Sequence, residues 1–346
     1  MTIFDLVTAN DLAAYWKVFL QERPPFLGDE LFPANKKLGL DIKWIKGAKG
    51  LPIVLKPSAY DVAAVPRPRI AFERFTAQMP FFKESKYIDE ELRQQLNMVI
   101  ESGNQAYIDS IINNVFDDEM SLLDGAAARR EQMRMSVLTS GAIAVSANGQ
   151  NYTYDYGVPT AHKANVDTAW SDTGTATIVE DIRVGQDLIE DDTGERPTRA
   201  VVSRKTWGYM LNNEIIRKSI YMFSDGRSTV SDTALKSYLM EQLELEVLVY
   251  SKRYVNDAGV STRYVPDDTF TLFPAGALGT TWFGTTPEES DLMARVASNV
   301  AITDVGVAVA TIAKEDPVNV DTKVTMICLP SFEMADHVYQ LDLTKA

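Results

Sequence analysis

The sequence has little of what chemistry at an enzyme site requires. Among its 346 residues there is one cysteine, Cys328, and there are two histidines, His162 and His337. A single cysteine excludes an internal disulfide framework, and no group of cysteines and histidines has the spacing of a zinc site. Motifs for a phosphate-binding loop, a dinucleotide-binding loop, a serine nucleophile or a zinc protease do not occur. The residues therefore give no support for catalysis, a cofactor or a metal.

Positive charge and long apolar runs are scarce as well. The chain has 34 lysine and arginine residues against 48 aspartate and glutamate residues, which gives a formal net charge of −14. A protein that grips nucleic acid needs clustered basic residues, and here they are dispersed, so only proximity to DNA without tight binding stays open. No stretch approaches the roughly 20 apolar residues of a membrane span, and the N-terminal stretch does not read as a signal peptide. We expect use in a cytosol, or in something assembled there, and no membrane partner.

The remaining candidates for chemistry are weak. The histidines lie in unrelated contexts, and Cys328 falls in the apolar strand-like text VTMICLP, which is typical of a buried inert thiol. Acidic residues gather near position 190 without the alternation of a calcium loop, so we interpret them as a solvated helix end before a turn at Gly194. These acidic residues are Glu190, Asp191, Asp192 and Glu195.

What the sequence does contain begins with two helical patterns. Apolar residues at helical spacing predict a short helix over residues 10–22, with an N-cap at Thr8 or Asn10. No proline occurs between Tyr87 and Thr139, and apolar residues recur there at three- and four-residue steps. A helix over residues 104–138 would be on the order of 50 Å long, which exceeds what a compact domain of this size needs.

The rest of the chain predicts a mixture of strands and helices. Alternating residues around Asn148 and Gly149 indicate a β-hairpin over residues 141–156. The following patterns predict helices at 175–192, 204–221 and 231–243, strands at 199–204 and 245–255, a Gly- and Thr-rich loop at 276–288, and strands at 305–313, 322–330 and 337–343. This order describes a mixed α/β region from about residue 170 to 275.

Residues 67–88 interleave phenylalanines with charged residues and contain prolines, and the phenylalanines are Phe72, Phe75, Phe81 and Phe82. We interpret this stretch as part of an extended arm at residues 41–80. A two-stranded arm of this kind can bury its phenylalanines on a neighbouring copy while its charges pair across the contact, and its prolines limit uncontrolled strand pairing. The candidate intersubunit contacts are Arg67, Arg69, Phe72, Glu73, Arg74 and Phe75. The candidate hinges are Gly39, Gly47 and Gly50, with ordinary turn glycines as the alternative.

Several segments, in this order and spacing, resemble the major capsid proteins of lambda-type tailed bacteriophages, the major capsid protein E family. The segments are RIAFERFTAQMPFFKESKYI, RREQMRMSVLTSGAIAV, NGQNYTYDYGVP, VVSRKTWGYMLNN, YVPDDTFTLFPAGALGTTWFGTTPE and LPSFEMADHVYQ. The resemblance runs from about residue 3 to 345, so it covers nearly the whole chain.

The resemblance implies an α+β protein with the HK97-like phage capsid fold. It implies an N-terminal arm at 1–40, an extended E-loop at 41–80, a peripheral domain with a long spine helix at 81–169 and 281–346, and an α/β axial domain at 170–280. It brings no catalytic residues. Some relatives crosslink a lysine to an asparagine of a neighbouring subunit, but nothing here marks the acidic helper residue that this reaction needs.

The function implied by the resemblance is that of a major capsid protein of a tailed phage or prophage. It would assemble into hexamers and pentamers of an icosahedral shell that encloses double-stranded DNA, in the host bacterial cytoplasm, with a scaffolding protein and a portal. Whether a decoration protein joins the shell stays open. Two alternatives are an encapsulin-like nanocompartment shell that packages an enzyme, and a metal-dependent hydrolase built on the acidic residues near position 190.

Overall fold

The structure is a computed structural model that describes residues 8–22, 24–46, 73–88, 105–147, 149–221, 229–294, 299–315 and 318–345, with the single positions 94 and 98. The chain divides into two compact units. Unit 1 comprises Met1–Ile42, Ala77–Arg134 and Thr280–Ser331, and unit 2 comprises Lys43–Thr76, Met135–Gly279 and Phe332–Ala346. Each unit is therefore built from segments that lie far apart in the sequence.

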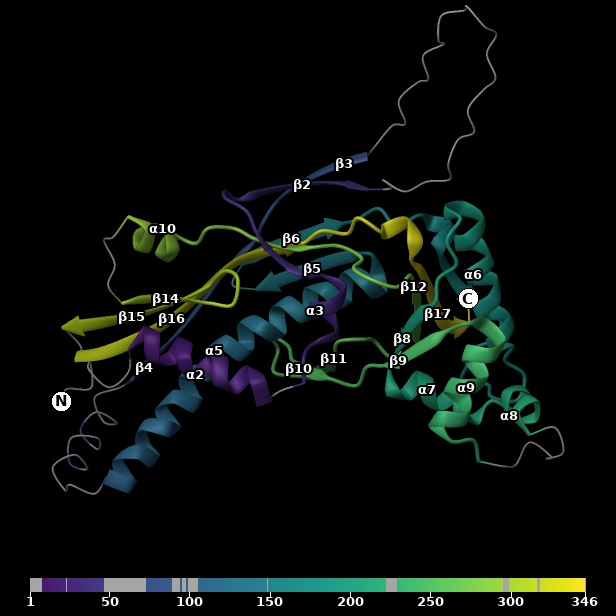
Figure 1. The fold of residues 1–346 in the computed structure, drawn as a ribbon, viewed down its shortest axis with the longest axis horizontal. Coiled ribbons are helices and arrows are strands. Elements are labelled where there is room, and N and C mark those ends of the chain that lie inside the picture. Colours follow the sequence, from purple (N-terminus) through teal and green to yellow (C-terminus); the bar gives the residue numbers. More distant parts are fainter. Residues whose placement is uncertain are drawn as a thin grey trace, which may run out of the picture. The chain divides into compact units, whose positions relative to one another are not determined.

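Unit 1 is organised around a six-stranded sheet (Figure 1). Its strands follow the order β1 (Ala34–Lys36), β13 (Thr281–Phe283), β16 (Val318–Pro330), β15 (Val307–Glu315) and β14 (Val300–Thr303), and β4 (Phe81–Ile88) also pairs with β16. Only the pairing of β1 with β13 is parallel among these strands. The 13-residue β16 is the central strand, because it pairs with β15 along one edge and with β4 and β13 in succession along the other.

The first helix of unit 1, α2 (Ala9–Glu22), forms where the sequence predicts it. The Thr8 hydroxyl accepts a hydrogen bond from the backbone N–H of Asp11, which caps one of the open donors of the first turn. The apolar face of α2 is buried and includes Leu12 and Trp16, each 1% exposed. This face packs on β14 and β15. Unit 1 also contains the short helices α3 (Leu27–Leu31) and α10 (Pro287–Met293).

The long helix is confirmed as α5 (Gln105–Ser140), which has 36 residues, and the division between the two units falls inside it. Among the helices that the structure describes, none combines the length and apolar character needed to cross a membrane. The predicted hairpin is also confirmed: β5 (Ala142–Ala147) and β6 (Gln150–Asp155) pair in antiparallel fashion. Asn148 of its turn lies outside the described residues, and Gly149 has a φ of 75°.

Unit 2 contains a five-stranded sheet in the order β7 (Lys163–Val166), β17 (Tyr339–Lys345), β12 (Thr269–Phe273), β8 (Arg199–Val202) and β9 (Glu246–Val249). The outer pairs β7–β17 and β8–β9 are parallel, and β12 is antiparallel to both of its neighbours. The helices of this unit are α6 (Ile178–Thr193), α7 (Arg204–Asn212), α8 (Glu214–Ile220) and α9 (Asp232–Leu243). They bury a continuous apolar core that includes Trp170, Trp207 and Phe270.

The remaining elements are short. Single turns of 3-10 helix, η1 (Thr160–His162) and η2 (Ala335–His337), precede β7 and β17. Strands β10 (Arg253–Val255) and β11 (Ser261–Arg263) form a small antiparallel hairpin. Strands β2 (Asp41–Lys46) and β3 (Glu73–Gln78) form a separate two-stranded sheet, the ribbon, inside the segment predicted as an extended arm.

Three details of the predicted elements are wrong. The helix predicted at 204–221 is two helices, because the backbone of Asn213 leaves helical geometry and its side chain caps α8 by accepting the N–H of Ile216. The predicted strand 245–255 is β9 and β10, which belong to different sheets. The loop predicted at 276–288 contains β13 and the start of α10, and β13 was missed because three residues give too short a pattern to recognise.

Candidate assembly interface

The ribbon formed by β2 and β3 is the predicted contact element. Arg67, Arg69 and Phe72 lie outside the described residues. Glu73, Arg74 and Phe75 form the start of β3 by their backbone, and their side chains are outside what the structure describes. The six candidate contacts therefore stay predictions, and what the structure adds is the backbone that would present three of them.

Of the three predicted hinge glycines, Gly47 and Gly50 also lie outside the described residues. Gly39 is described, and its φ of 93° is in the left-handed region that favours glycine. A Cβ built on Gly39 would meet no heavy atom within 4 Å, so its surroundings are open. Gly39 lies two residues before β2, which is the place where a hinge would redirect the outgoing strand.

The root of the ribbon is anchored on the sheet of unit 1. The N–H of Lys37 donates to the carbonyl of Phe283 over 2.8 Å, and the N–H of Met79 donates to the carbonyl of Leu40 over 2.8 Å. Gly284 permits this approach, because a Cβ there would lie 2.9 Å from the Gly39 carbonyl oxygen and 2.8 Å from Cγ2 of Ile327. On the return path, Phe81 begins β4 opposite Ile327. The residues that flank the ribbon, 37–40 and 79–81, are thus fixed within unit 1.

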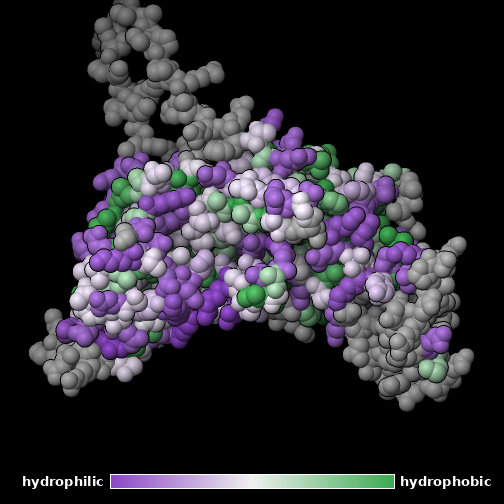
Figure 2. All heavy atoms as spheres, turned by 180° about the vertical axis from the view of Figure 1, so that it is seen from behind, coloured by the Kyte–Doolittle hydropathy of each residue, from purple (hydrophilic) through white to green (hydrophobic). Residues whose placement is uncertain are grey.

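Three apolar side chains at this root are exposed, and sequence reasoning missed them. Leu38 is 77% exposed, Leu40 45% and Phe81 40%. The alternating text KLGL around Gly39 is the signal that could have drawn attention to them. On the face of the molecule shown in Figure 2, the described hydrophobic residues occur in small groups among hydrophilic ones. Small apolar groups within a polar surface suit contacts that are individually weak.

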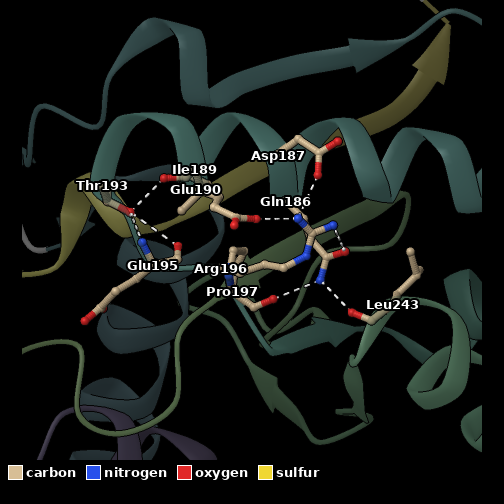
Figure 3. A network of polar contacts seen from close by, with 9 residues as sticks. All are labelled: Gln186, Asp187, Ile189, Glu190, Thr193, Glu195, Arg196, Pro197 and Leu243. Carbon is tan, nitrogen blue, oxygen red and sulfur yellow. Dashed lines mark hydrogen bonds and ion pairs between the residues drawn. The ribbon is translucent and has the colours of Figure 1, made fainter. Parts of the chain in front are cut away.

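Three of the acidic residues near position 190, Glu190, Asp191 and Asp192, lie at the C-terminal end of α6, and Glu190 has a partner there (Figure 3). The guanidinium of Arg196 donates to Asp187 over 2.7 Å and to Glu190 over 2.5 Å. Burial alone would lower the pKa of Arg196, but the hydrogen bonds to these two carboxylates outweigh it and raise the pKa. Gly194, with a φ of 76°, ends the helix as the sequence predicts. Among the described residues, no group of three or more histidine, cysteine, aspartate and glutamate side chains is arranged to hold a metal ion.

The two histidines and the cysteine are buried in these units. His162 lies at the end of η1 with its Nε2 2.8 Å from Oδ2 of Asp192. His337 lies at the end of η2 with its Nε2 3.9 Å from Oε2 of Glu195. Cys328 is fully buried in β16, and burial raises the pKa of its thiol to about 12. Its burial is as predicted, and because the thiolate is the reactive form, we expect the folded protein to keep this cysteine unreactive.

Comparison with protein families decides what this architecture belongs to. The model of the family "Phage major capsid protein E" matches residues 8–343. The chain belongs to the phage major capsid protein E family. Comparison with curated protein sequences finds no match.

Solved structures show the same fold. One, assigned as the capsid protein of a prophage in Escherichia coli CFT073, matches with a TM-score of 0.61 and 16% identity, over 98% of this chain and 99% of that chain. A phage-related protein from Bordetella bronchiseptica RB50 matches with a TM-score of 0.58 and 13% identity, over 98% of both chains. The capsid of Myoviridae phage XM1 matches with a TM-score of 0.51 and 9% identity, over 94% of this chain and 90% of that chain.

Family and fold together confirm the expected role. The protein is a structural phage capsid protein with the α+β, HK97-like architecture, and its place is in the virion capsid. Capsid proteins act by assembling with copies of themselves, so this family implies a structural protein and not an enzyme. For a capsid protein, the functional site is the set of surfaces that meet other copies.

Proposed function

We propose that this capsid protein forms the hexamers and pentamers of an icosahedral shell around double-stranded DNA, in a tailed phage or a prophage. The observation that carries the proposal is the family match, which extends over residues 8–343. The net charge of −14 supports a container that encloses DNA without binding it tightly, because like charges on shell and genome repel.

Each of the predicted domains has its own role in the shell. Residues 41–80 act as the E-loop that reaches a neighbouring subunit, residues 170–280 as the axial domain, and residues 81–169 and 281–346 as the peripheral domain after the N-terminal arm at 1–40. The paired strands β2 and β3 support the role of the E-loop, and the 36-residue α5 supports that of a spine helix. Gly39 serves as the hinge where the E-loop leaves its anchored root.

Assembly takes place in the cytoplasm of the host bacterium with a scaffolding protein and a portal, and a decoration protein is an optional later partner. Each contact between subunits should be weak, with a free energy on the order of −4 kcal/mol, so that a misplaced subunit can leave before the shell closes. The exposed apolar residues at the root of the E-loop, which include Leu38 and Phe81, are of a size that suits such contacts.

Sedimentation velocity with negative-stain electron microscopy tests this function, on the protein expressed alone and then with its scaffolding protein. We expect rings, capsomers or closed shells. Closed shells that hold an enzyme and exclude DNA would instead support a nanocompartment. A monodisperse small species under both conditions, with stoichiometric bound metal, would contradict the shell proposal and revive the hydrolase alternative.

The E-loop contact has its own test. The double variant Phe72→Ser with Phe75→Ser should remain folded but form no shells, because it loses the apolar anchor of the contact. Phe72→Tyr with Phe75→Tyr is the matched control, since it keeps the rings and should still assemble. Circular dichroism checks folding, and sedimentation velocity checks assembly. Normal shells from the serine variant would show that the E-loop assignment is wrong.

A further inference from the structure

Residues 27–36, which we call the strap, cross unit 1 as helix α3 followed by strand β1. The side chains of Leu31 and Phe32 are 0% exposed, so the strap is inserted into the core of the unit. Its strand is nevertheless only three residues long and lies at the edge of the sheet, paired in parallel with β13 alone. Strand β1 of the strap is therefore an edge strand, and the other strands of the sheet pair with one another without it.

A group of polar side chains beneath the strap holds it in place, and we call Glu131, Arg134 and Thr281 the latch. Glu131 accepts the N–H of Gly28 over 3.2 Å, and Nη1 of Arg134 donates to Oδ1 of Asp29 over 2.5 Å. Thr281 links the two sides, because its hydroxyl accepts from Nε of Arg134 over 2.8 Å and donates to the carbonyl of Phe32 over 2.9 Å. Every member of the latch thus contacts the strap directly.

The latch is built for this one segment. Glu131 is 0% exposed and Arg134 is 2% exposed, so their charges depend on close partners. At position 28 only glycine fits, because a Cβ there would overlap with the Glu131 carboxylate and lie 2.6 Å from Cδ of Arg134. Arg134 and Glu131 also face each other at 3.9 Å, a contact that involves no residue of the strap. If the strap is released, Arg134 and Glu131 therefore each keep an oppositely charged neighbour.

The strap is also continuous with the root of the E-loop. Strand β1 ends at Lys36, Lys37 is hydrogen-bonded to Phe283, and Gly39 follows with open surroundings. Lys36 further forms an ion pair with Glu289 at the start of α10. The position of the strap thus sets the point from which the outgoing strand of the E-loop departs.

We propose that the strap is a detachable element of unit 1, which opens without unfolding of the sheet, and that Arg134 controls how often it opens. The open state frees the base of the E-loop, and this second arrangement would let one sequence serve at non-identical positions of a shell. That use in assembly rests on the proposed function, whereas the opening itself is a property of the unassembled chain.

The buried cysteine provides a native reporter. Lys36 pairs with Phe283 and Phe283 pairs with Cys328, so the thiol lies two strands in from the strap. A disulfide reagent such as 5,5′-dithiobis(2-nitrobenzoic acid) can react only when the covering structure opens. Hydrogen exchange with mass spectrometry follows the same event in peptides that cover residues 27–37, and peptides from β15 and β16 report the rest of the sheet.

The experiment compares the unassembled full chain with three variants. In Arg134→Lys the fork that reaches both Asp29 and Thr281 is lost, so exchange of the strap and labelling of Cys328 should rise about tenfold or more. Asp29→Asn changes a half-exposed residue, so we expect the chain to fold normally. This variant should give a smaller increase in the same two measurements. Arg130→Lys is the matched control, because Arg130 lies on the same helix and pairs with Asp304, and lysine keeps the positive charge that Arg130 places over the ring of Phe283.

The outcomes separate cleanly. Faster strap exchange in Arg134→Lys and Asp29→Asn, with unchanged exchange in β15 and β16 and no effect of Arg130→Lys, supports the proposal. Strap exchange that always equals that of β15 and β16 would show that the strap opens only with the whole unit, and overturns it. An equal effect of Arg130→Lys also overturns it. Failure of the wild-type chain to form shells would contradict the proposed function and leave these measurements unaffected.

Discussion

The interiors of the two units differ in how they satisfy polar groups. In unit 2 the described buried polar side chains are amides, hydroxyls and the two histidines, and several of them cap or bridge backbone groups. Ser203 caps α7, Asn213 caps α8, and the side chain of Gln186 donates to the carbonyls of Pro197 and Leu243. In the described part of unit 1, carboxylates and a guanidinium are buried as well, namely Glu131, Arg134, Glu288 and Glu289.

The two units therefore differ in the interactions that hold their segments together. Unit 2 is held by an apolar core, and among its described buried polar side chains, none of which is a carboxylate or a guanidinium, several cap helix ends or bridge backbone groups. Unit 1 joins distant segments through charged groups, as Arg134 does with Asp29 and Lys323 does with Glu288. In each pair one charge, Arg134 or Glu288, is buried, and a buried charge without its partner is costly, so these contacts favour one specific arrangement of the segments.

The largest effect is expected from the core of unit 2. Trp207 is 0% exposed within this core, and its ring N–H donates to Asp232 over 3.0 Å. Trp207→Ala should lower the free energy of unfolding by about 3–5 kcal/mol because it leaves a large cavity. Denaturant unfolding of the unassembled chain measures this loss, with Trp207→Phe as a milder control. A loss below that of Trp207→Phe would mean that unit 2 does not depend on its apolar core as described.

An intermediate effect is expected at the latch of unit 1. Thr281→Val keeps the shape but removes the hydroxyl between Arg134 and Phe32, which should cost about 1–3 kcal/mol. Thr271→Val in β12 of unit 2 is the matched control, since Thr271 is buried to nearly the same extent, at 1% exposed against 0% for Thr281. Equal losses in the two valine variants, measured by denaturant unfolding, would remove the distinction between the units.

The smallest effects concern pH and have opposite signs in the two units. Burial alone would raise the pKa of Glu288, but the hydrogen bonds from Lys323 and Thr325 outweigh it and hold the pKa below its ordinary value. Its contribution to stability is therefore present above the ordinary glutamate pKa and is lost as the pH falls through the lowered value. In unit 2, burial raises the pKa of Asp181 against the hydrogen bonds from Trp170 and Thr177. Acidification therefore relieves a penalty at Asp181.

Unfolding measured between about pH 3 and 7 tests these signs, within the range in which carboxyl groups ordinarily titrate. Glu288→Gln should weaken the loss of stability on acidification, and Asp181→Asn should make that loss steeper, because it removes the compensating gain. If both variants changed the pH dependence in the same direction, the contrast between the two carboxyls would be wrong.

Much of the fold follows from local patterns. The periodicity of α2 and α5, the turn at Gly149 and the end of α6 at Gly194 are each determined by a few neighbouring residues. The break at Asn213 was missed because an asparagine within a helical pattern signals a cap only once the next helix is known. Strand β13 was missed because its stability comes from its partners β1 and β16, which are distant in the sequence.

The assembly surfaces were predictable only in part. Interleaved charges and phenylalanines predict an intersubunit arm, and this stays a prediction. The resemblance of ordered segments to a known family predicted the role of the whole chain, which the family match confirms. The latch could not be predicted. Gly28, Glu131 and Thr281 are separated by more than 100 residues each, and no local pattern shows that a glutamate and an arginine one turn apart on a helix will be buried under a strap.

The position of β17 between β7 and β12 has a consequence for synthesis. The ribosome synthesises residues 163–273 before residues 339–345. Strand β7 on one side, and β12, β8 and β9 on the other, therefore cannot form one sheet until β17 has been made. Closure of long loops slows folding, and the waiting sheet leaves apolar strand edges uncovered. A nascent chain of this protein is therefore most exposed to aggregation just before β17 emerges, and the arrival of that strand sets the earliest moment at which unit 2 can be complete.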